Sequence, residues 1–139
     1  MREIKFRAWD EKKKVMFVPS SINWKFIGGQ NTLWVCDAHG ENKLEYELVN
    51  PNAHLMQFTG LQDKKGVDIY EGDIVRIKHP EDRCGDFKDT LGRVFYDDKQ
   101  TGFYHGHCFP SGNGRPPKKM WEYCEVVGNI YQNPELLKE

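Results

Sequence analysis

The residues best suited to chemistry are three histidines and two cysteines in the second half of the chain. They are His79, Cys84, His105, His107 and Cys108. Imidazole and thiolate groups on adjacent loops are the usual ligands of tetrahedral zinc. In a strand, however, His105 and His107 would point to one face and Cys108 to the other. We therefore expect ordinary loop and strand-end residues and no cofactor, with zinc at these five positions as an alternative.

Carboxylates form a second group that could act on a substrate. Asp68, Glu71 and Asp73 lie near one predicted turn, and the pair Asp97 and Asp98 follows a predicted strand. Such groups can hold Mg²⁺ or transfer protons, but turns also use aspartate for local backbone hydrogen bonds. No neighbouring lysine or histidine completes a nuclease pattern, and nucleophile-elbow, Walker A and dinucleotide motifs are absent from the sequence. We expect structural carboxylates, and a metal-dependent enzyme is the last of our alternatives.

Basic residues lie near aromatic residues in the second half of the chain, and together the two kinds of side chain could form a binding face. The residues that we assign to this face are Tyr70, Arg76, Lys78, Arg93, Tyr96, Tyr104, Lys118 and Lys119. A small β-barrel can expose such rings to a peptide or to single-stranded nucleic acid. Most of the other aromatic residues are expected in the core.

The overall charge favours a protein partner. The 139 residues carry a formal net charge of −1, and the first 60 contain eight basic and seven acidic residues, so neither half is strongly basic. This balance argues against a membrane surface and makes nucleic acid the second choice after a protein partner or self-association through edge strands. The chain begins without an apolar signal segment, has no 18-residue apolar run and has no C-x-x-C pair among its four cysteines. We expect a soluble, intracellular protein without disulfides.

The elements that must position these residues have a hydrophobic period of two, which predicts strands. In the first half, residues 4–9 and 15–18 flank a polar turn, and residues 32–36 and 43–48 flank Gly40, so each pair predicts a hairpin. Residues 54–58 predict a further strand that ends at Gly60.

The second half continues with turns and short strands. Residues 63–66 predict a turn, and Gly72 predicts a bulge or sharp bend before a strand at 74–78. Residues 93–96 and 102–104 predict a third hairpin, and 121–127 a last strand. The polar, Pro- and Gly-rich residues 110–119 predict a mobile loop. Asn133, Pro134 and Glu135 predict the start of a short C-terminal helix, which Leu136 and Leu137 would dock.

Several short, bent strands favour a closed or nearly closed barrel, because closure removes exposed sheet edges. We expect a single, mainly β domain over residues 1–139. An N-terminal hairpin region (1–53) would precede a small SH3-like barrel (54–139), which carries the mobile loop and ends in the short helix.

Three segments of the chain resemble the YopX family of bacteriophages and prophages. They are the opening residues 1–10, the glycine-punctuated residues 59–76 and the ending residues 127–137. The resemblance carries no biochemical activity over to this chain and implies the cytoplasm of a bacterial host. From the residues and the resemblance together, we expect a non-enzymatic binding or assembly module that forms an oligomer, with a nucleic-acid-binding accessory factor as the alternative.

Overall fold

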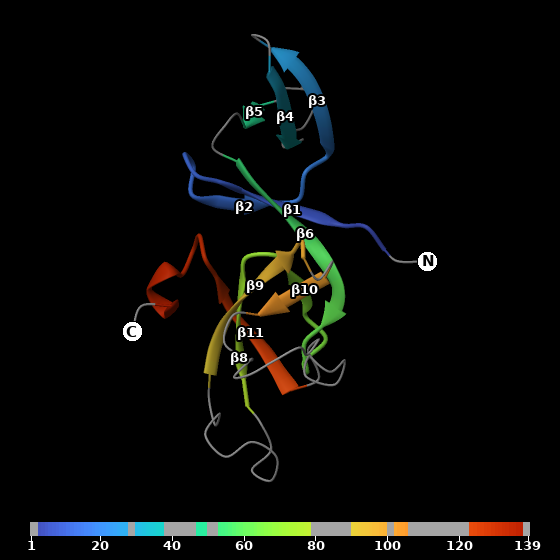
Figure 1. Cartoon of the computed structure of the whole chain (residues 1–139). Helices are drawn as coiled ribbons and strands as arrows, with labels where there is room; N and C mark the ends of the chain where they lie inside the picture. Colours follow the sequence, from blue (N-terminus) through green and yellow to red (C-terminus); the bar gives the residue numbers. More distant parts are fainter. Residues whose placement is uncertain are drawn as a thin grey trace. The chain divides into compact units, whose positions relative to one another are not determined.

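The computed structural model shows a mainly β protein, as predicted (Figure 1). The structure describes residues 3–27, 30–37, 47–49, 53–78, 90–99, 102–105 and 123–137, with 24–27, 30–37, 47–49, 90, 104 and 105 described by their backbone alone. The strands are β1 (Phe6–Asp10), β2 (Val15–Phe17), β3 (Ser21–Ile27), β4 (Gln30–Asp37), β5 (Glu47–Val49), β6 (Ala53–Gln62), β7 (Asp68–Tyr70), β8 (Asp73–Ile77), β9 (Thr90–Asp97), β10 (Gly102–His105) and β11 (Cys124–Asn129). The described residues include no α-helix; a 3-10 helix, η2 (Pro134–Leu137), follows β11.

The chain forms two compact units. The N-terminal unit is Lys5–Gln57, and the C-terminal unit combines Met1–Ile4 with Phe58–Glu139. Strand β6 contributes to both, because it pairs antiparallel with β1 in the N-terminal unit and with β7 in the C-terminal unit. In the part of the chain that the structure describes, no helix has the length and apolar character needed to cross a membrane.

The predicted first hairpin is confirmed in the N-terminal unit. Strands β1 and β2 pair antiparallel, and β6 lies on the other side of β1. The carboxylate of Asp10 accepts the backbone N–H groups of Lys12 and Lys13 at 2.8 and 2.9 Å, which fixes the turn between the two strands. Ala8 and Phe17 are buried together beneath Leu55. A local polar turn and a small apolar cluster therefore specify this hairpin.

A second antiparallel sheet in the same unit has the order β3-β4-β5. The predicted pairing of residues 32–36 with residues 43–48 is confirmed where both are described, since Cys36 lies opposite Leu48 in β5. The pairing extends to Val49, and the predicted turn at Gly40 and residues 43–46 lie outside the described residues. Strand β3 was not predicted. Its alternation of Ile22, Trp24 and Phe26 with polar neighbours was the available signal.

The C-terminal unit is built on a curled, half-barrel antiparallel sheet with the order β10-β9-β8-β11 (Figure 1). The hairpin predicted over residues 93–104 is its β9–β10 pair. One face of the sheet is buried. Its core side chains are Ile69, Val75, Ile77, Val94 and Cys124, against which Leu61 and Val126 pack. Along β8, Val75 and Ile77 lie on this face on either side of Arg76, as expected for residues two apart in a strand, and Ile74 on the opposite face is also buried.

The turn predicted at residues 63–66 is confirmed, and Asp63 organises it. One oxygen of its carboxylate, Oδ1, accepts the N–H groups of Lys65 (2.7 Å) and Val67 (3.0 Å) within the turn. The other oxygen, Oδ2, accepts the N–H of Val126 on β11 at 3.0 Å. The backbone N–H of Lys64 also bonds to the carbonyl of Cys124 (3.1 Å). The turn between β6 and β7 is thereby tied to the last strand of the chain.

Two glycine positions refine the predicted strand boundaries. The prediction that a strand ends at Gly60 is wrong, since β6 continues to Gln62 and accommodates the positive φ of Gly60 (83°) by a shift in register. The sharp bend at Gly72 is confirmed, with a φ of 76° in the turn between β7 and β8. The buried carboxylate of Asp73 accepts the N–H of Tyr70 at 2.8 Å and so holds this bend.

The predicted C-terminal helix is wrong, because the chain forms only the four-residue 3-10 helix there. The side chain of Asn133 does not cap it but lies 3.5 Å from the Glu135 carboxylate, and the closing bond runs from Leu136 N–H to the Asn133 carbonyl over three residues. Leu137 does not dock, since 40% of it is exposed. The turn between β11 and this 3-10 helix is organised by the buried side chain of Asn129.

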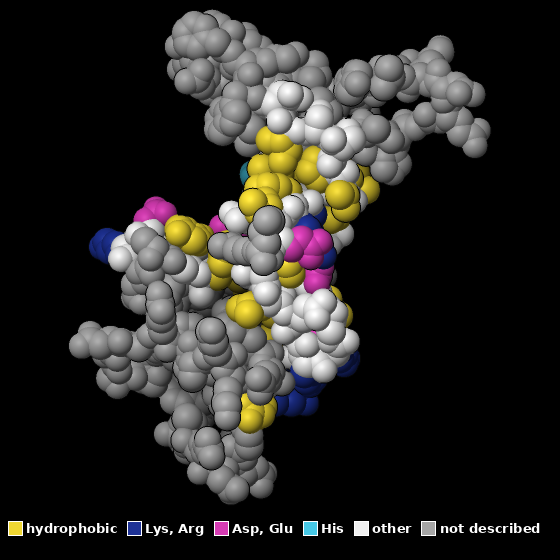
Figure 2. All heavy atoms as spheres, turned by 90° about the vertical axis from the view of Figure 1, so that its right-hand side faces the viewer, with side chains coloured by type: hydrophobic (Ala, Val, Ile, Leu, Met, Phe, Trp, Pro, Cys, Tyr) yellow, Lys and Arg dark blue, Asp and Glu magenta, His cyan; other side chains and the backbone are white. Residues whose placement is uncertain are grey.

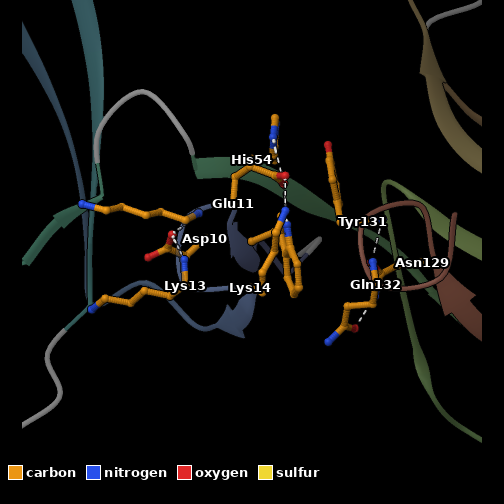
Figure 3. A network of polar contacts seen from close by, with 10 residues as sticks. Asp10, Glu11, Lys13, Lys14, His54, Asn129, Tyr131 and Gln132 are labelled. Carbon is orange, nitrogen blue, oxygen red and sulfur yellow. Dashed lines mark hydrogen bonds and ion pairs between the residues drawn. The ribbon is translucent and has the colours of Figure 1, made fainter.

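Asn129 ends β11 and folds the chain back (Figure 3). Its Oδ1 accepts the N–H groups of Tyr131 (3.1 Å) and Gln132 (2.9 Å), and its backbone carbonyl accepts the N–H of Asn133. These bonds bring Asn133 over Gly128, where a Cβ atom would lie 2.5 Å from the Asn133 Oδ1. The glycine before Asn129 is therefore required by close packing.

We predict that Gly66→Ala lowers the free energy of unfolding by about 1 kcal/mol. The φ of Gly66 is 81°, and no atom lies within 4 Å of a Cβ built there, so the loss reflects backbone conformation alone. Gly66→Asn is the matched control and should lose less, because asparagine tolerates the left-handed region. Urea unfolding measures both variants, and equal losses would contradict this explanation.

A second prediction concerns Gly128. Gly128→Ala should destabilise the protein by about 1–3 kcal/mol, because the new methyl group meets the Cγ, Oδ1 and Cβ atoms of Asn133. The double variant Gly128→Ala/Asn133→Ala removes two of these three atoms. In urea unfolding it should lose less than the sum of the two single changes, and strict additivity would show that the clash is not the cause.

Acid should destabilise the C-terminal unit through two carboxylates. Bonds from Lys64 and then Lys65 lower the pKa of Glu125 from 4.5 to about 2. Burial, the largest single influence on Asp63, raises its pKa, but the N–H groups of Val126, Val67 and Lys65 together outweigh it, so that the pKa lies below 3.8. Because both pKa values are lower in the folded state, their stabilisation is complete above about pH 4.5 and is lost as pH falls toward 2.

The check on this prediction is thermal unfolding from pH 6 to pH 3 of the wild type and of Glu125→Gln. The variant should start with a lower melting temperature and lose less of it on acidification. A loss as steep as that of the wild type would exclude Glu125 from the acid response.

Candidate functional site

Four of the eight predicted binding residues, Arg76, Arg93, Tyr96 and Tyr104, lie on strands of the half-barrel sheet, and strand register assigns each to one of its faces. We call the face that carries Val75, Ile77, Val94 and Cys124 the inner face and the opposite one the outer face. Arg76 on β8 lies opposite Leu91 on β9, and Arg93 on β9 lies opposite Ile74 on β8. Residues directly opposite share a face, so Arg76 and Arg93 are diagonal neighbours on the outer face.

Both charges and rings occupy this outer face. The Arg93 guanidinium carbon lies 5.9 Å from the centre of the Phe95 ring, within range of a cation–π contact. Glu125, opposite Arg76 on β11, pairs with Lys64 at 2.7 Å and Lys65 at 2.5 Å. The outer face therefore carries more cations than anions. Its Glu125 carboxylate contacts the two lysines of the turn between β6 and β7.

A second aromatic group lies on the inner face, beyond the core. Tyr96 follows Val94 by two residues on β9 and lies opposite Phe103 on the edge strand β10. The two ring centres are 5.2 Å apart at an interplanar angle of 74°, an edge-to-face contact. Phe103 is half-buried, whereas 42% of Tyr96 is exposed. This pair extends the apolar inner face to the protein surface.

The predicted set is thus divided between the two faces, because Arg93 and Tyr96 are an odd number of residues apart on one strand. Tyr104 lies opposite Phe95 and takes an outer-face position of β10, described by its backbone. Tyr70 on β7 packs against Phe58, with ring centres 5.5 Å apart, and Lys78 is exposed after β8. The predicted residues Lys118 and Lys119, like the predicted loop 110–119, lie outside the described residues.

The candidate zinc ligands are nearly all beyond the described part of the chain. His79, Cys84, His107 and Cys108 lie outside it, and His105 is described by its backbone in β10. Among the described residues, no group of three or more histidine, cysteine, aspartate or glutamate side chains is placed to hold a metal ion. Cys124 is buried, and burial raises the pKa of its thiol to about 12.

Three of the five carboxylates considered for catalysis have structural uses. The carboxylate of Asp68 accepts a bond from Gln62 Nε2 at 2.9 Å, and Asp97 accepts the backbone N–H of Lys99 at 2.8 Å. Asp73 holds the Gly72 bend. Each bond is local to a turn or hairpin, as the residue types predicted.

A polar cluster in the N-terminal unit was not predicted (Figure 3). The carboxylate of Glu11 accepts the indole N–H of Trp9 at 2.9 Å, forms an ion pair with Lys14, and lies 3.9 Å from His54 Nε2. The bond from Lys14, followed by that from Trp9, lowers the pKa of Glu11. This carboxylate is therefore ionised at neutral pH and suited to anchoring the β1–β2 turn, not to donating a proton.

Three further residues of the sheet surface were also missed: Phe103, Lys64 and Lys65. The sequence shows the lysine pair within a turn, but their joint contact with Glu125 depends on a strand that begins 59 residues after Lys65. Phe103 was assigned to the third hairpin, whose register identifies Tyr96 as its partner only once the turn length is known.

Figure 2 shows Lys and Arg side chains of the described residues close to Asp, Glu and hydrophobic side chains on the face in view.

Comparisons with known proteins agree with this fold. The model of the YopX protein family matches residues 5–138 of the chain. The chain is also similar to a solved structure, the crystal structure of protein EF1440 from Enterococcus faecalis, with 26% sequence identity and a TM-score of 0.61 over 99% of this chain and 100% of that one. No functionally curated protein matches the sequence. Because the family model spans nearly the whole chain, this protein belongs to the YopX family.

Proposed function

We propose that this chain is a non-enzymatic binding or assembly module that associates with a second copy of itself through the Tyr96–Phe103 pair. The observation that carries the proposal is an aromatic pair on the edge hairpin of the sheet, in which the Tyr96 ring is exposed and the Phe103 ring is half-buried. Within the described residues, β10 pairs with β9 alone and is an edge of the sheet. An edge strand beside an exposed aromatic surface can accept another strand and bury the rings with it.

The physical reason for choosing this surface is the energy that its burial would supply. Tyrosine has a large apolar area and a polar end, and it loses little conformational entropy when it is immobilised, so tyrosines are common among residues that dominate interfaces. The edge-to-face contact with Phe103 already holds the Tyr96 ring. A preorganised ring costs less to bury in a partner than a freely rotating one.

We further propose that the half-barrel of the C-terminal unit is of the SH3-like kind and that the protein acts in the cytoplasm of a bacterial host. The support for the fold is the sharp turn at Gly72, the short strand β7 before it and the four-stranded antiparallel sheet after it. The support for the location is the family membership.

The alternative is a nucleic-acid-binding accessory factor. It is favoured by the shared outer face of Arg76 and Arg93, with Lys64 and Lys65 beside Glu125. Glu125 stands among these cations, however, and Arg93 contacts Phe95. A phosphate backbone would have to displace such contacts, so we rank this function second.

The test is the native mass of the purified protein, measured by light scattering in low and high salt, with absorbance at 260 nm recorded on the same peak. We expect an oligomer that resists salt and carries no nucleic acid. Tyr96→Ala should weaken its association about ten-fold or more, which corresponds to the loss of one important interface residue.

Tyr123→Ala is the matched control, because 40% of Tyr123 is exposed and it lies outside the aromatic pair. Its association should equal that of the wild type. A monomer that releases nucleic acid in high salt would favour the alternative function. A monomer free of nucleic acid at all concentrations, or equal effects of the two tyrosine variants, would contradict the proposed surface.

A further inference from the structure

The two edges of the half-barrel sheet differ in how they are covered. In the order β10-β9-β8-β11, the second edge strand, β11, pairs with β8 on one side. On its other side it contacts residues 63–66, the turn between β6 and β7, which we call the strap. The strap is not a strand, but it bonds to backbone groups of β11 that would otherwise pair with a neighbouring strand.

Two backbone groups of β11 that face away from β8 form hydrogen bonds with the strap. The carbonyl of Cys124 accepts the N–H of Lys64 at 3.1 Å, and the N–H of Val126 donates to Asp63 Oδ2 at 3.0 Å. These residues are two apart, which is the repeat of groups on one edge of a strand. One main-chain donor and one side-chain acceptor in the strap therefore replace the donor and acceptor of an added strand.

Ion pairs between side chains also hold the strap against β11. Lys64 and Lys65 both contact the Glu125 carboxylate, between the two bonded residues of β11. Asp63 is buried, with 6% of it exposed, and its other oxygen holds the strap's own turn through Lys65 and Val67. A single carboxylate thus shapes the strap and fastens it to the edge.

We propose that the strap closes the β11 edge against strand addition, and that the strand it excludes is β11 of a second copy of this chain. The choice of partner rests on complementarity. In an antiparallel pair of β11 strands related by two-fold symmetry, the Cys124 carbonyl of each copy can accept the Val126 N–H of the other. The groups that the strap covers are therefore mutually satisfying between two copies.

Charge supplies a second reason why the edge is closed in the isolated chain. In this pairing Glu125 lies opposite its own copy, and like charges directly opposite one another destabilise a sheet. Lysines 64 and 65 neutralise that carboxylate only while the strap is in place. Strap removal and neutralisation of Glu125 should thus act in the same direction, toward association.

This inference goes beyond the proposed function, which uses the opposite edge at β10. A sheet with both edges open can add copies at each end and grow into a filament, whereas closure of one edge limits growth. The strap would confine strand-mediated association of this chain to the β10 side.

The experiment is sedimentation velocity over a range of protein concentrations, in a Tyr96→Ala background that weakens the proposed β10-side association. Addition of Asp63→Ala should raise the native mass about two-fold at high concentration, as expected for a symmetric dimer. Adding Glu125→Gln to Asp63→Ala should shift this dimerisation to lower concentrations. Because the background lacks Tyr96, failure of the proposed function leaves this result interpretable.

Asp10→Ala in the same background is the matched control. Asp10 is also buried and caps a turn through two backbone N–H groups, but those groups lie in its own hairpin. Its native mass should stay unchanged. If Asp63→Ala does not fold, by circular dichroism, Asp63→Asn decides the question, because it keeps a side-chain oxygen for the turn. A folded Asp63 variant whose mass equals that of the Asp10 control at every concentration would overturn the proposal.

Discussion

The C-terminal unit depends on one carboxylate. Asp63 is buried and accepts three backbone N–H groups, two in its own turn and one from Val126, 63 residues later. Hydrogen bonds to a charged acceptor contribute on the order of 1.5–3 kcal/mol each, and their loss would leave buried donors unpaired. This side chain therefore does more than shape a turn, since it joins the β6–β7 hairpin to the last strand of the chain.

The rest of the unit is arranged around that connection. With β11 held at one edge, Cys124 and Val126 pack against the core formed by Ile69 and Val94. The buried Cys124 thiol serves as a small apolar side chain there, since its raised pKa keeps it protonated at neutral pH. The opposite edge, at β10, carries the Tyr96–Phe103 pair. The sheet thus has one edge covered by the chain itself and one edge with exposed aromatic surface, which is the basis of the assembly function that we propose.

Local patterns predicted the parts of this fold that depend on neighbours in sequence. The period of two gave three of the hairpins, and residue types gave the Asp63 turn and the Gly72 bend. Long-range register was not accessible, so neither the bond from Val126 to Asp63 nor the pairing of Glu125 with two lysines could be predicted. For the same reason, residues predicted on one binding face are divided between two.

Two local features were also missed, for different reasons. Strand β3 had a clear alternation of apolar and polar residues, and a stricter count of that period would have found it. The C-terminal helix had proper starting signals, but such signals mark where a helix begins and do not supply the packing that a short helix needs. With 40% of Leu137 exposed, the segment closes as a 3-10 turn.

The most direct test of this account is hydrogen exchange of the Val126 backbone amide in the native protein, followed by NMR. If Asp63 fastens β11 as described, this edge amide should exchange with the slow, cooperative rate of the core amides of β8, such as that of Val75. Exchange as fast as that of the exposed turn amide of Lys99 would contradict the account, because it would show that the Asp63 bond to β11 does not persist in solution.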